Sequence, residues 1–172
     1  MLTHSNLPFL QMKFKDFELN SSNHFIAMQY FGLILNRTFL VLLTKDQIIG
    51  IKVNGLVSVE SGGNMLAKEL SNTMTVKGDL QNPYAYVKSK YLDRVQDLEL
   101  VDTDILKQDK SNFVIHRADI NNAYYDPNKK WGMGYYPHDG KVYVATNDGK
   151  KKEFIILGNQ SGHKIASLIM TK

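Results

Sequence analysis

The sequence of 172 residues contains no cysteine, which excludes disulfide bonds, thiolate metal ligands and a cysteine nucleophile. Glycine and proline are also few, with 12 and 4 residues, so a collagen-like or low-complexity chain is excluded. Hydrophobic residues make up 43% of the chain and charged residues 22%, a balance typical of globular proteins. We therefore expect a single domain, residues 1–172, with a hydrophobic core.

Arginine is scarce, because only three of the 21 basic residues are arginines: Arg37, Arg94 and Arg117. The planar guanidinium group suits the reading of bases and a bidentate grip on phosphate better than the lysine ammonium does. The composition therefore disfavours sequence-specific recognition of nucleic acid. The net charge of +4 suits solubility or a weak attraction to an acidic surface.

Long hydrophobic runs are absent. The most apolar stretch, residues 31–43, is interrupted by Asn36-Arg37-Thr38 and is shorter than the roughly 20 residues that a membrane-spanning helix needs. Residues 1–19 contain several charged side chains and no apolar signal-peptide core. We expect no transmembrane segment and residence in the cytoplasm.

Aromatic and β-branched residues dominate the first third of the chain and predict strands there. Asn36-Arg37 suits a tight turn, and Asn54-Gly55 is a strong hairpin signal because both residues tolerate positive φ. The sequence therefore predicts an antiparallel meander with strands at residues 24–35, 38–44, 48–53 and 56–59.

A helix is predicted to begin at Asn82-Pro83, because Asn suits the N-cap and Pro the first helical position. Apolar residues then recur at spacings of three and four and would share one helix face. We expect this face to pack on the core, as part of a helical insertion at about residues 61–107. The face consists of Tyr84, Val87, Tyr91, Val95 and Leu98.

Strand patterns return after residue 111. The clearest is residues 141–146, where Val142 and Val144 alternate with Tyr143. A closing amphipathic helix is expected at residues 159–170, with Asn159 or Ser161 as its cap. The other strands are expected at residues 113–120, 131–136 and 153–157.

Catalytic and metal-binding motifs are mostly missing. The histidines at positions 4, 24, 116, 138 and 163 lack the spacing that presents two imidazoles to one metal. Asp102-Thr103-Asp104 follows an apolar run and could serve phosphoryl transfer or a divalent ion, but a solvated loop or a helix cap explains it more simply. Nucleophile-elbow and P-loop motifs are also absent. We expect no catalytic residue, no metal and no cofactor.

Two surfaces are candidates for binding. Lys150-Lys151-Lys152 follows a predicted turn and would place three positive charges at a hairpin tip, where they contact anionic groups or only solvent. Aromatic residues are concentrated beside glycines shortly before this turn. They form either a binding rim or part of an aromatic core, and they are Tyr124, Tyr125, Trp131, Tyr135 and Tyr136.

The order of these patterns resembles the pleckstrin-homology-like superfamily, including bacterial PH and GRAM-like domains. The resemblance is carried by residues 36–51, NRTFLVLLTKDQIIGI, and by residues 140–157, GKVYVATNDGKKKEFIIL, which run into the final helix. It implies an α+β fold: an antiparallel PH-like barrel or sandwich of about seven strands, with a C-terminal capping helix and a helical insertion between two groups of strands. Trp131 lies outside the closing helix, and residues 44–47 lack the basic set of inositide-binding members. No lipid specificity and no site residues are therefore carried over.

We expect a non-enzymatic binding module that engages a protein, a peptide or a membrane surface. One alternative is a small enzyme or ligand-binding barrel whose site is assembled from scattered residues such as Asp102, Asp104 and His116. Another is a structural protein that self-associates through an edge strand or through the helix at residues 83–96. A protein or peptide is the favoured partner. Weak contact with an anionic membrane and formation of a homo-oligomer both stay open.

Overall fold

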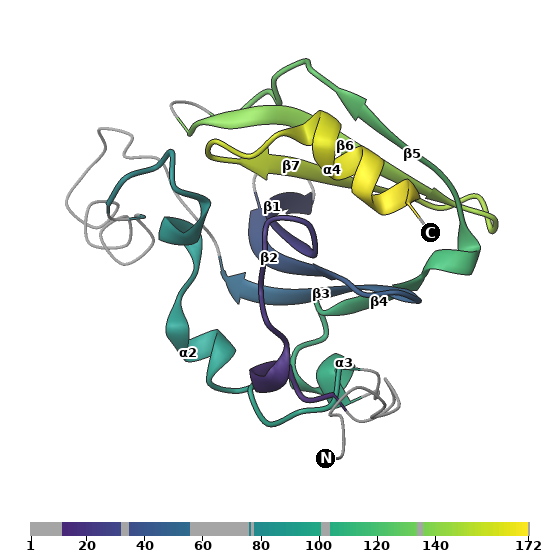
Figure 1. Ribbon diagram of the computed structural model, residues 1–172. Helices are drawn as coiled ribbons and strands as arrows, with labels where there is room; N and C mark the ends of the chain where they lie inside the picture. The colour runs from purple at the N-terminus through teal and green to yellow at the C-terminus, as the bar shows by residue number, and fades with distance from the viewer. Residues whose placement is uncertain are drawn as a thin grey trace, which may run out of the picture.

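The computed structural model describes residues 12–31, 35–55, 76, 78–100, 104–133 and 136–171. One antiparallel sheet contains seven strands in the order β4-β3-β2-β1-β7-β6-β5 and curls into a half-barrel (Figure 1). The expected α+β fold class is therefore confirmed. The strands are β1 (His24–Phe31), β2 (Leu35–Leu43), β3 (Gln47–Asn54), β4 (Phe113–His116), β5 (Ile120–Asp126), β6 (His138–Thr146) and β7 (Lys151–Leu157).

The C-terminal helix α4 (Gly162–Met170) packs mainly against β5 and β6 (Figure 1). Ser161 is its N-cap, since the Ser161 hydroxyl accepts a hydrogen bond from the Lys164 N–H at 3.3 Å. The expected closing helix is thus confirmed, beginning at residue 162. The other helical segments are short: η2 (Phe14–Asp16), η3 (Pro83–Tyr86), α2 (Ser89–Leu92), α3 (Asp104–Gln108) and η4 (Arg117–Asp119).

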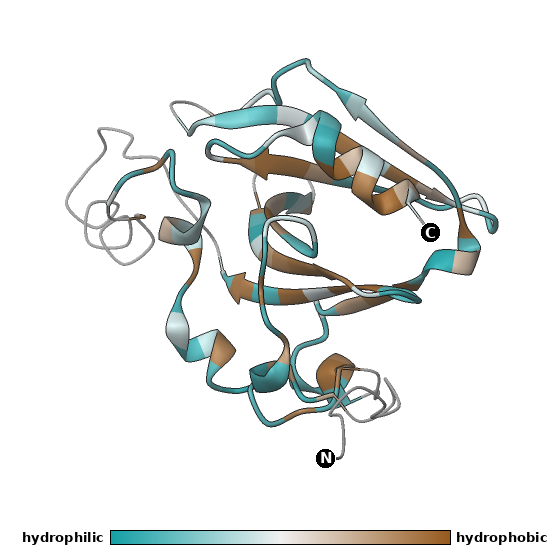
Figure 2. Cartoon of the chain, viewed as in Figure 1, coloured by the Kyte–Doolittle hydropathy of each residue, from teal (hydrophilic) through white to brown (hydrophobic). Residues whose placement is uncertain are grey.

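Both faces of the sheet are covered. The inner face, which carries Phe25, Phe39 and Phe154, packs against α4. The outer face, which carries Ile26 and Ile155, packs against the segment between β3 and β4. Hydrophobic residues accordingly follow one another without alternating polar ones in parts of three strands (Figure 2): residues 25–28 of β1, 39–43 of β2 and 154–157 of β7.

The turn expected at Asn36-Arg37 is wrong. Both residues lie in β2, opposite Tyr30 and Gln29 of β1. The ladder continues to the pair Phe31↔Leu35, and the Arg37 guanidinium stacks 4.2 Å from the centroid of the Phe31 ring. Strand pairing and stacking therefore outweigh the local turn preference of Asn36.

The single helix expected over residues 82–98 is also wrong. Asn82 caps η3 as expected, but Val87 and Lys88 are extended and separate η3 from α2. The Lys88 N–H donates to the carbonyl oxygen of Val53 at the end of β3, so packing on the sheet breaks the helical period. The insertion lies between β3 and β4, the last strand before residue 61 and the first after residue 111, and these two strands pair with each other.

Two expected strands differ from the structure. The strand at residues 113–120 is interrupted, because η4 separates β4 from β5. Residues 131–133 form a turn in which Gly132 has a φ of 86°. The strand expected at residues 56–59 lies outside the described residues. Within the described part of the chain, no helix is long and apolar enough to cross a bilayer.

Candidate functional site

A cleft of about 870 Å³ lies between β4 and the β6–β7 hairpin. β4 is an edge of the half-barrel, and no other described strand pairs with its outer side. We call it the β4–β7 cleft. It is lined by Phe113, Val114, Ile115 and His116 of β4, by Asp119 of η4, and by Val144, Thr146, Asn147, Asp148, Lys150, Lys151 and Lys152 of the hairpin.

Lys152 is the lysine of the triplet that enters this cleft. It shares the inner face of β7 with Phe154, since residues two apart on a strand point the same way. Its Nζ lies 4.0 Å from the centroid of the Phe113 ring, a cation–π contact. Burial lowers the pKa of Lys152, and no carboxylate among the described residues forms an ion pair with it.

Lys150 and Lys151 have different surroundings. Lys150 is exposed and forms an ion pair with Asp148, 2.6 Å from Nζ to Oδ2. The side chain of Lys151 lies on the outer face, where its Nζ is 4.6 Å from the centroid of the Tyr143 ring. The three lysines thus all border the cleft, but only Lys152 brings an ammonium group over its apolar wall.

The apolar wall of the cleft is built around Phe113. Its ring centroid is 5.5 Å from that of Phe39 and 5.8 Å from that of Phe154. Gly50 lies directly opposite on β3, and a Cβ atom there would come within 2.1 Å of the Phe113 ring. The missing side chain of Gly50 therefore makes the room that the ring occupies. Sequence reasoning missed this pair, although a glycine inside an apolar strand is a signal of close packing.

His116 stands at the end of β4 and is exposed. Its Nδ1 is 3.4 Å from the Nε2 of Gln47. This contact ties the imidazole of His116 to the amide group of Gln47 on the neighbouring strand β3. His116 therefore stands at the rim of the cleft with its ring held against β3.

The scattered acidic and histidine set is not brought together in this cleft. Asp104 begins α3, forms an ion pair with Lys107 at 2.6 Å, and is not among the residues that line the cleft beside His116. Asp102 lies outside the described residues. The described residues also contain no group of three or more His, Asp or Glu side chains that could hold a metal ion.

The aromatic candidates are dispersed over several environments. Tyr124 stacks on Tyr143 at 5.1 Å on the outer face, and its neighbour Tyr125 donates to the Oδ1 of Asp139 at 2.7 Å. Tyr136 is partly buried against the outer-face core, whereas Trp131 is 86% exposed. Tyr135 lies outside the described residues. The described members therefore do not form one continuous rim.

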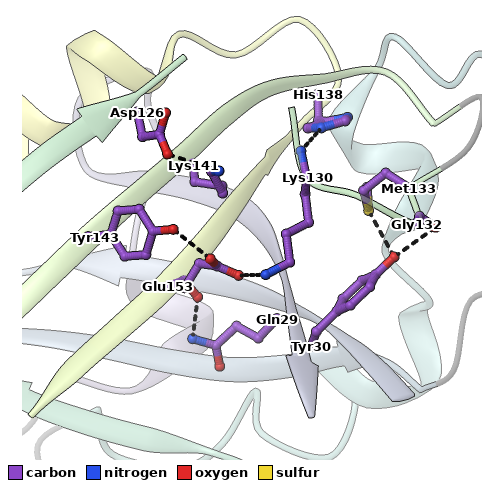
Figure 3. A network of polar contacts seen from close by, with 10 residues as sticks. All are labelled: Gln29, Tyr30, Asp126, Lys130, Gly132, Met133, His138, Lys141, Tyr143 and Glu153. Atoms are coloured by element: carbon purple, nitrogen blue, oxygen red, sulfur yellow. Dashed lines mark hydrogen bonds and ion pairs between the residues drawn. The ribbon is translucent and has the colours of Figure 1, made fainter. Parts of the chain in front are cut away.

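A polar network supports β7 next to the cleft (Figure 3). The Glu153 carboxylate accepts from Lys130 Nζ at 2.6 Å and from the Tyr143 hydroxyl at 2.7 Å, and its backbone carbonyl accepts from Gln29 Nε2 at 3.0 Å. Burial alone would raise the pKa of Glu153, but the bonds from Lys130 and Tyr143 bring it below its ordinary value. Burial and the bond to Glu153 raise the pKa of Tyr143. The network holds β7 in place through contacts that no local sequence pattern predicts.

His138 is an internal part of the same region (Figure 3). It is only 6% exposed, and its Nε2 accepts a hydrogen bond from the Lys130 N–H at 3.0 Å. Its Nδ1 lies 2.9 Å from the carbonyl oxygen of Tyr136, so Nδ1 carries the proton of a neutral ring. Burial lowers the pKa of His138, which fits a structural role for the uncharged form.

No family model, curated protein or solved structure matches this chain. The case for a function therefore depends on the geometry of the cleft.

Proposed function

We propose that this chain is a non-enzymatic binding module whose β4–β7 cleft receives an acidic group of a protein or peptide partner. The observation that carries the proposal is the Lys152 ammonium, which is partly buried beside Phe113 and has no carboxylate partner in the described part of the chain. Removing a charge from water without a partner is costly, and an incoming carboxylate would offset that cost.

The shape of the cleft favours a ligand that also has apolar groups. The partly exposed side chains of Phe113 and Ile115 provide an apolar wall, and the buried Val144 lies behind it. A free inorganic anion would leave this wall uncovered, whereas a segment that alternates acidic and apolar side chains would fill both parts of the cleft.

The strand order and the closing helix support a wider proposal, namely membership of the pleckstrin-homology-like superfamily. This likeness concerns architecture and does not identify the ligand. We also propose cytoplasmic residence, with which a cysteine-free chain is compatible.

The experiment is a titration of the isotope-labelled protein with the peptide acetyl-Val-Glu-Val-Glu-Val-Glu-amide, followed by amide chemical shifts. We expect the shifts to centre on Phe113–His116 and on Lys151 and Lys152. Lys152→Met should weaken binding about tenfold or more, because a partly desolvated charge pair is lost. Lys164→Met is the matched control and should leave binding nearly unchanged, since Lys164 is exposed on α4 and does not line the cleft.

Two further ligands separate a peptide site from other anion binding. The basic peptide acetyl-Val-Lys-Val-Lys-Val-Lys-amide should not bind. The protein should bind vesicles of anionic phospholipid more weakly than it binds the acidic peptide. Binding of the acidic peptide that Lys152→Met leaves unchanged would refute the proposal, as would vesicle binding that depends on Lys150 and not on Lys152.

A further inference from the structure

β4 is an edge strand, and no other described strand pairs with its outer side, so its backbone there forms an open hydrogen-bonding edge. The Arg117 N–H donates to the carbonyl oxygen of Asp46 at 2.9 Å, and the β3–β4 register continues from there one residue at a time to Gly50↔Phe113. Hydrogen-bonded pairs alternate along an antiparallel ladder. Phe113 and Ile115 therefore bond to β3, and the N–H and C=O groups of Val114 and the N–H of His116 point away from the sheet. The His116 carbonyl is the N-cap acceptor of η4 and is already used.

This open edge faces the β4–β7 cleft. All four residues of β4 line the cleft, although their side chains alternate between the two faces of the sheet. Consecutive residues can line one cleft together only when the strand presents its edge to it. The outward groups of Val114 and His116 are thus accessible from the cleft.

The opposite wall is an incomplete ladder as well. β7 pairs with β1 only at Ile155 and Ile156, and toward its start the side chain of Gln29 bonds the Glu153 carbonyl in place of a strand. The start of β7 is therefore held by side chains and not by a neighbouring strand on its β1 side. Lys152 reaches from the β7 wall to the Phe113 end of β4.

We propose that an extended acidic segment of a partner protein adds to the sheet as a strand beside β4. This inference rests on the proposed function and specifies how the partner is held. Backbone hydrogen bonds form to Val114 and His116, and an acidic side chain of the added strand neutralises Lys152. Strand addition suits an edge of this kind, because main-chain bonds supply affinity and the flanking side chains supply specificity.

The charge of the cleft selects this occupant. Lys152 attracts an acidic side chain at the Phe113 end of β4, whereas the Asp119 carboxylate lines the cleft beyond His116 and repels one there, so the charge also sets where the acidic side chain lies. A second copy of this chain pairing through its own β4 would bring two Lys152 ammonium groups to one interface and is disfavoured.

Amide hydrogen exchange tests the backbone contact directly. With acetyl-Val-Glu-Val-Glu-Val-Glu-amide bound, exchange at Val114 and His116 should slow at least severalfold. Phe113 and Ile115 are internal controls, because their N–H groups already bond to β3 and should change little.

A pair of variants isolates one backbone donor. The backbone at His116 has a φ of −71°, which is the value that proline imposes, and its N–H points out of the sheet. His116→Pro therefore removes that donor without breaking the β3–β4 ladder. His116→Ala removes only the imidazole. We expect His116→Pro to bind the peptide roughly three- to tenfold more weakly than His116→Ala, the effect of one hydrogen bond.

The outcomes separate the two proposals. In one outcome, peptide binding requires Lys152, but the β4 amides are not protected from exchange and the two His116 variants bind equally well. This outcome would overturn strand addition and keep the cleft as the binding site. Binding that does not require Lys152 would overturn the proposed function itself. If His116→Pro unfolds at a lower temperature than His116→Ala, two methylated peptides replace this pair of variants. One carries N-methyl groups on the backbone amides of its Val residues, the other on those of its Glu residues. Strand addition requires one of the two peptides to lose binding, because alternate amides of the added strand face β4, and equal binding by both would overturn it.

Discussion

The guanidinium of Arg117 donates a hydrogen bond to the carbonyl oxygen of Ile169 at 2.7 Å. The same Nη1 lies 3.0 Å from the carbonyl oxygen of Thr171, and Nε donates to the carbonyl oxygen of Thr44 at 2.7 Å. Arg117 in η4 thus joins the turn between β2 and β3 to the C-terminal end of α4. It satisfies carbonyl groups that the end of a helix leaves without partners, and its charge complements the helix dipole.

Arg117→Met should lower the free energy of unfolding by about 2–3 kcal/mol, because several charge-assisted hydrogen bonds are lost together. Arg117→Lys should recover only part of this loss. The lysine ammonium lacks the planar guanidinium group that bonds the carbonyl oxygens of Thr44 and Ile169 at the same time. Urea denaturation measures both values. Arg94→Met is the control, because Arg94 is exposed, and its effect should stay within about 0.5 kcal/mol. Equal effects at Arg117 and Arg94 would contradict the bridge.

The unpaired charge in the cleft should cost stability in the free protein. Lys152→Met keeps an apolar contact with the Phe113 ring and removes the partly buried ammonium, so we expect it to raise the free energy of unfolding by about 0.5–1 kcal/mol. The same variant should lose peptide binding. Thermal and urea unfolding without ligand are the measurements, with Lys150→Met as the exposed control. A clear destabilisation by Lys152→Met would show that the cation–π contact with Phe113 stabilises the fold by more than the burial of the unpaired charge costs.

The sequence predicted those parts of the fold that depend on a single periodicity. Val142 and Val144 are buried and Tyr143 is not, as their alternation required, and Ser161 caps a helix that the apolar spacing indicated. The turn at Asn36-Arg37 failed because the ladder with the preceding strand β1 extends through both residues to the pair Phe31↔Leu35. Local preferences are weak where strand pairing adds a hydrogen bond and a stacked side chain at each step.

The candidate site was only half visible in the sequence. The lysine triplet marked one wall of the cleft, and the alternation with Phe154 already separates Lys152 from Lys151. The other wall, Phe113 on β4, comes from a segment almost forty residues earlier. The sequence does not show that the sheet curls until β4 faces the β6–β7 hairpin, because neither segment carries a local signal for the other.

Gly50→Ala should disturb the cleft more than a single methyl group suggests. The new Cβ would lie 2.1 Å from the Phe113 ring, which must then move off the strand. We expect a loss of about 1–3 kcal/mol in the free energy of unfolding from overpacking, together with weaker peptide binding. A double-mutant cycle with Phe113→Ala provides the control. Removal of the ring removes the clash, so the two effects should be strongly non-additive, and simple additivity would contradict the contact.

The buried neutral His138 should make the stability of the protein depend on pH. Burial lowers the pKa of His138 in the folded state, whereas in the unfolded chain the ring titrates near pH 6.5. As the pH falls below about 6.5, the unfolded state binds the proton first, so the free energy of unfolding decreases until the folded-state pKa is reached. Protonation of Nε2 would also oppose the bond from the Lys130 N–H.

Urea denaturation at several pH values between 7.5 and 5 measures this effect. His138→Gln should lower stability at pH 7.5 and flatten its decline toward pH 5, because the titrating group is gone. His163→Gln is the matched control: His163 is exposed on α4, so the variant should keep the decline of the original protein. Parallel curves for the original protein and His138→Gln would assign the pH dependence to another group, of which His24, whose pKa burial also lowers, is the first to examine.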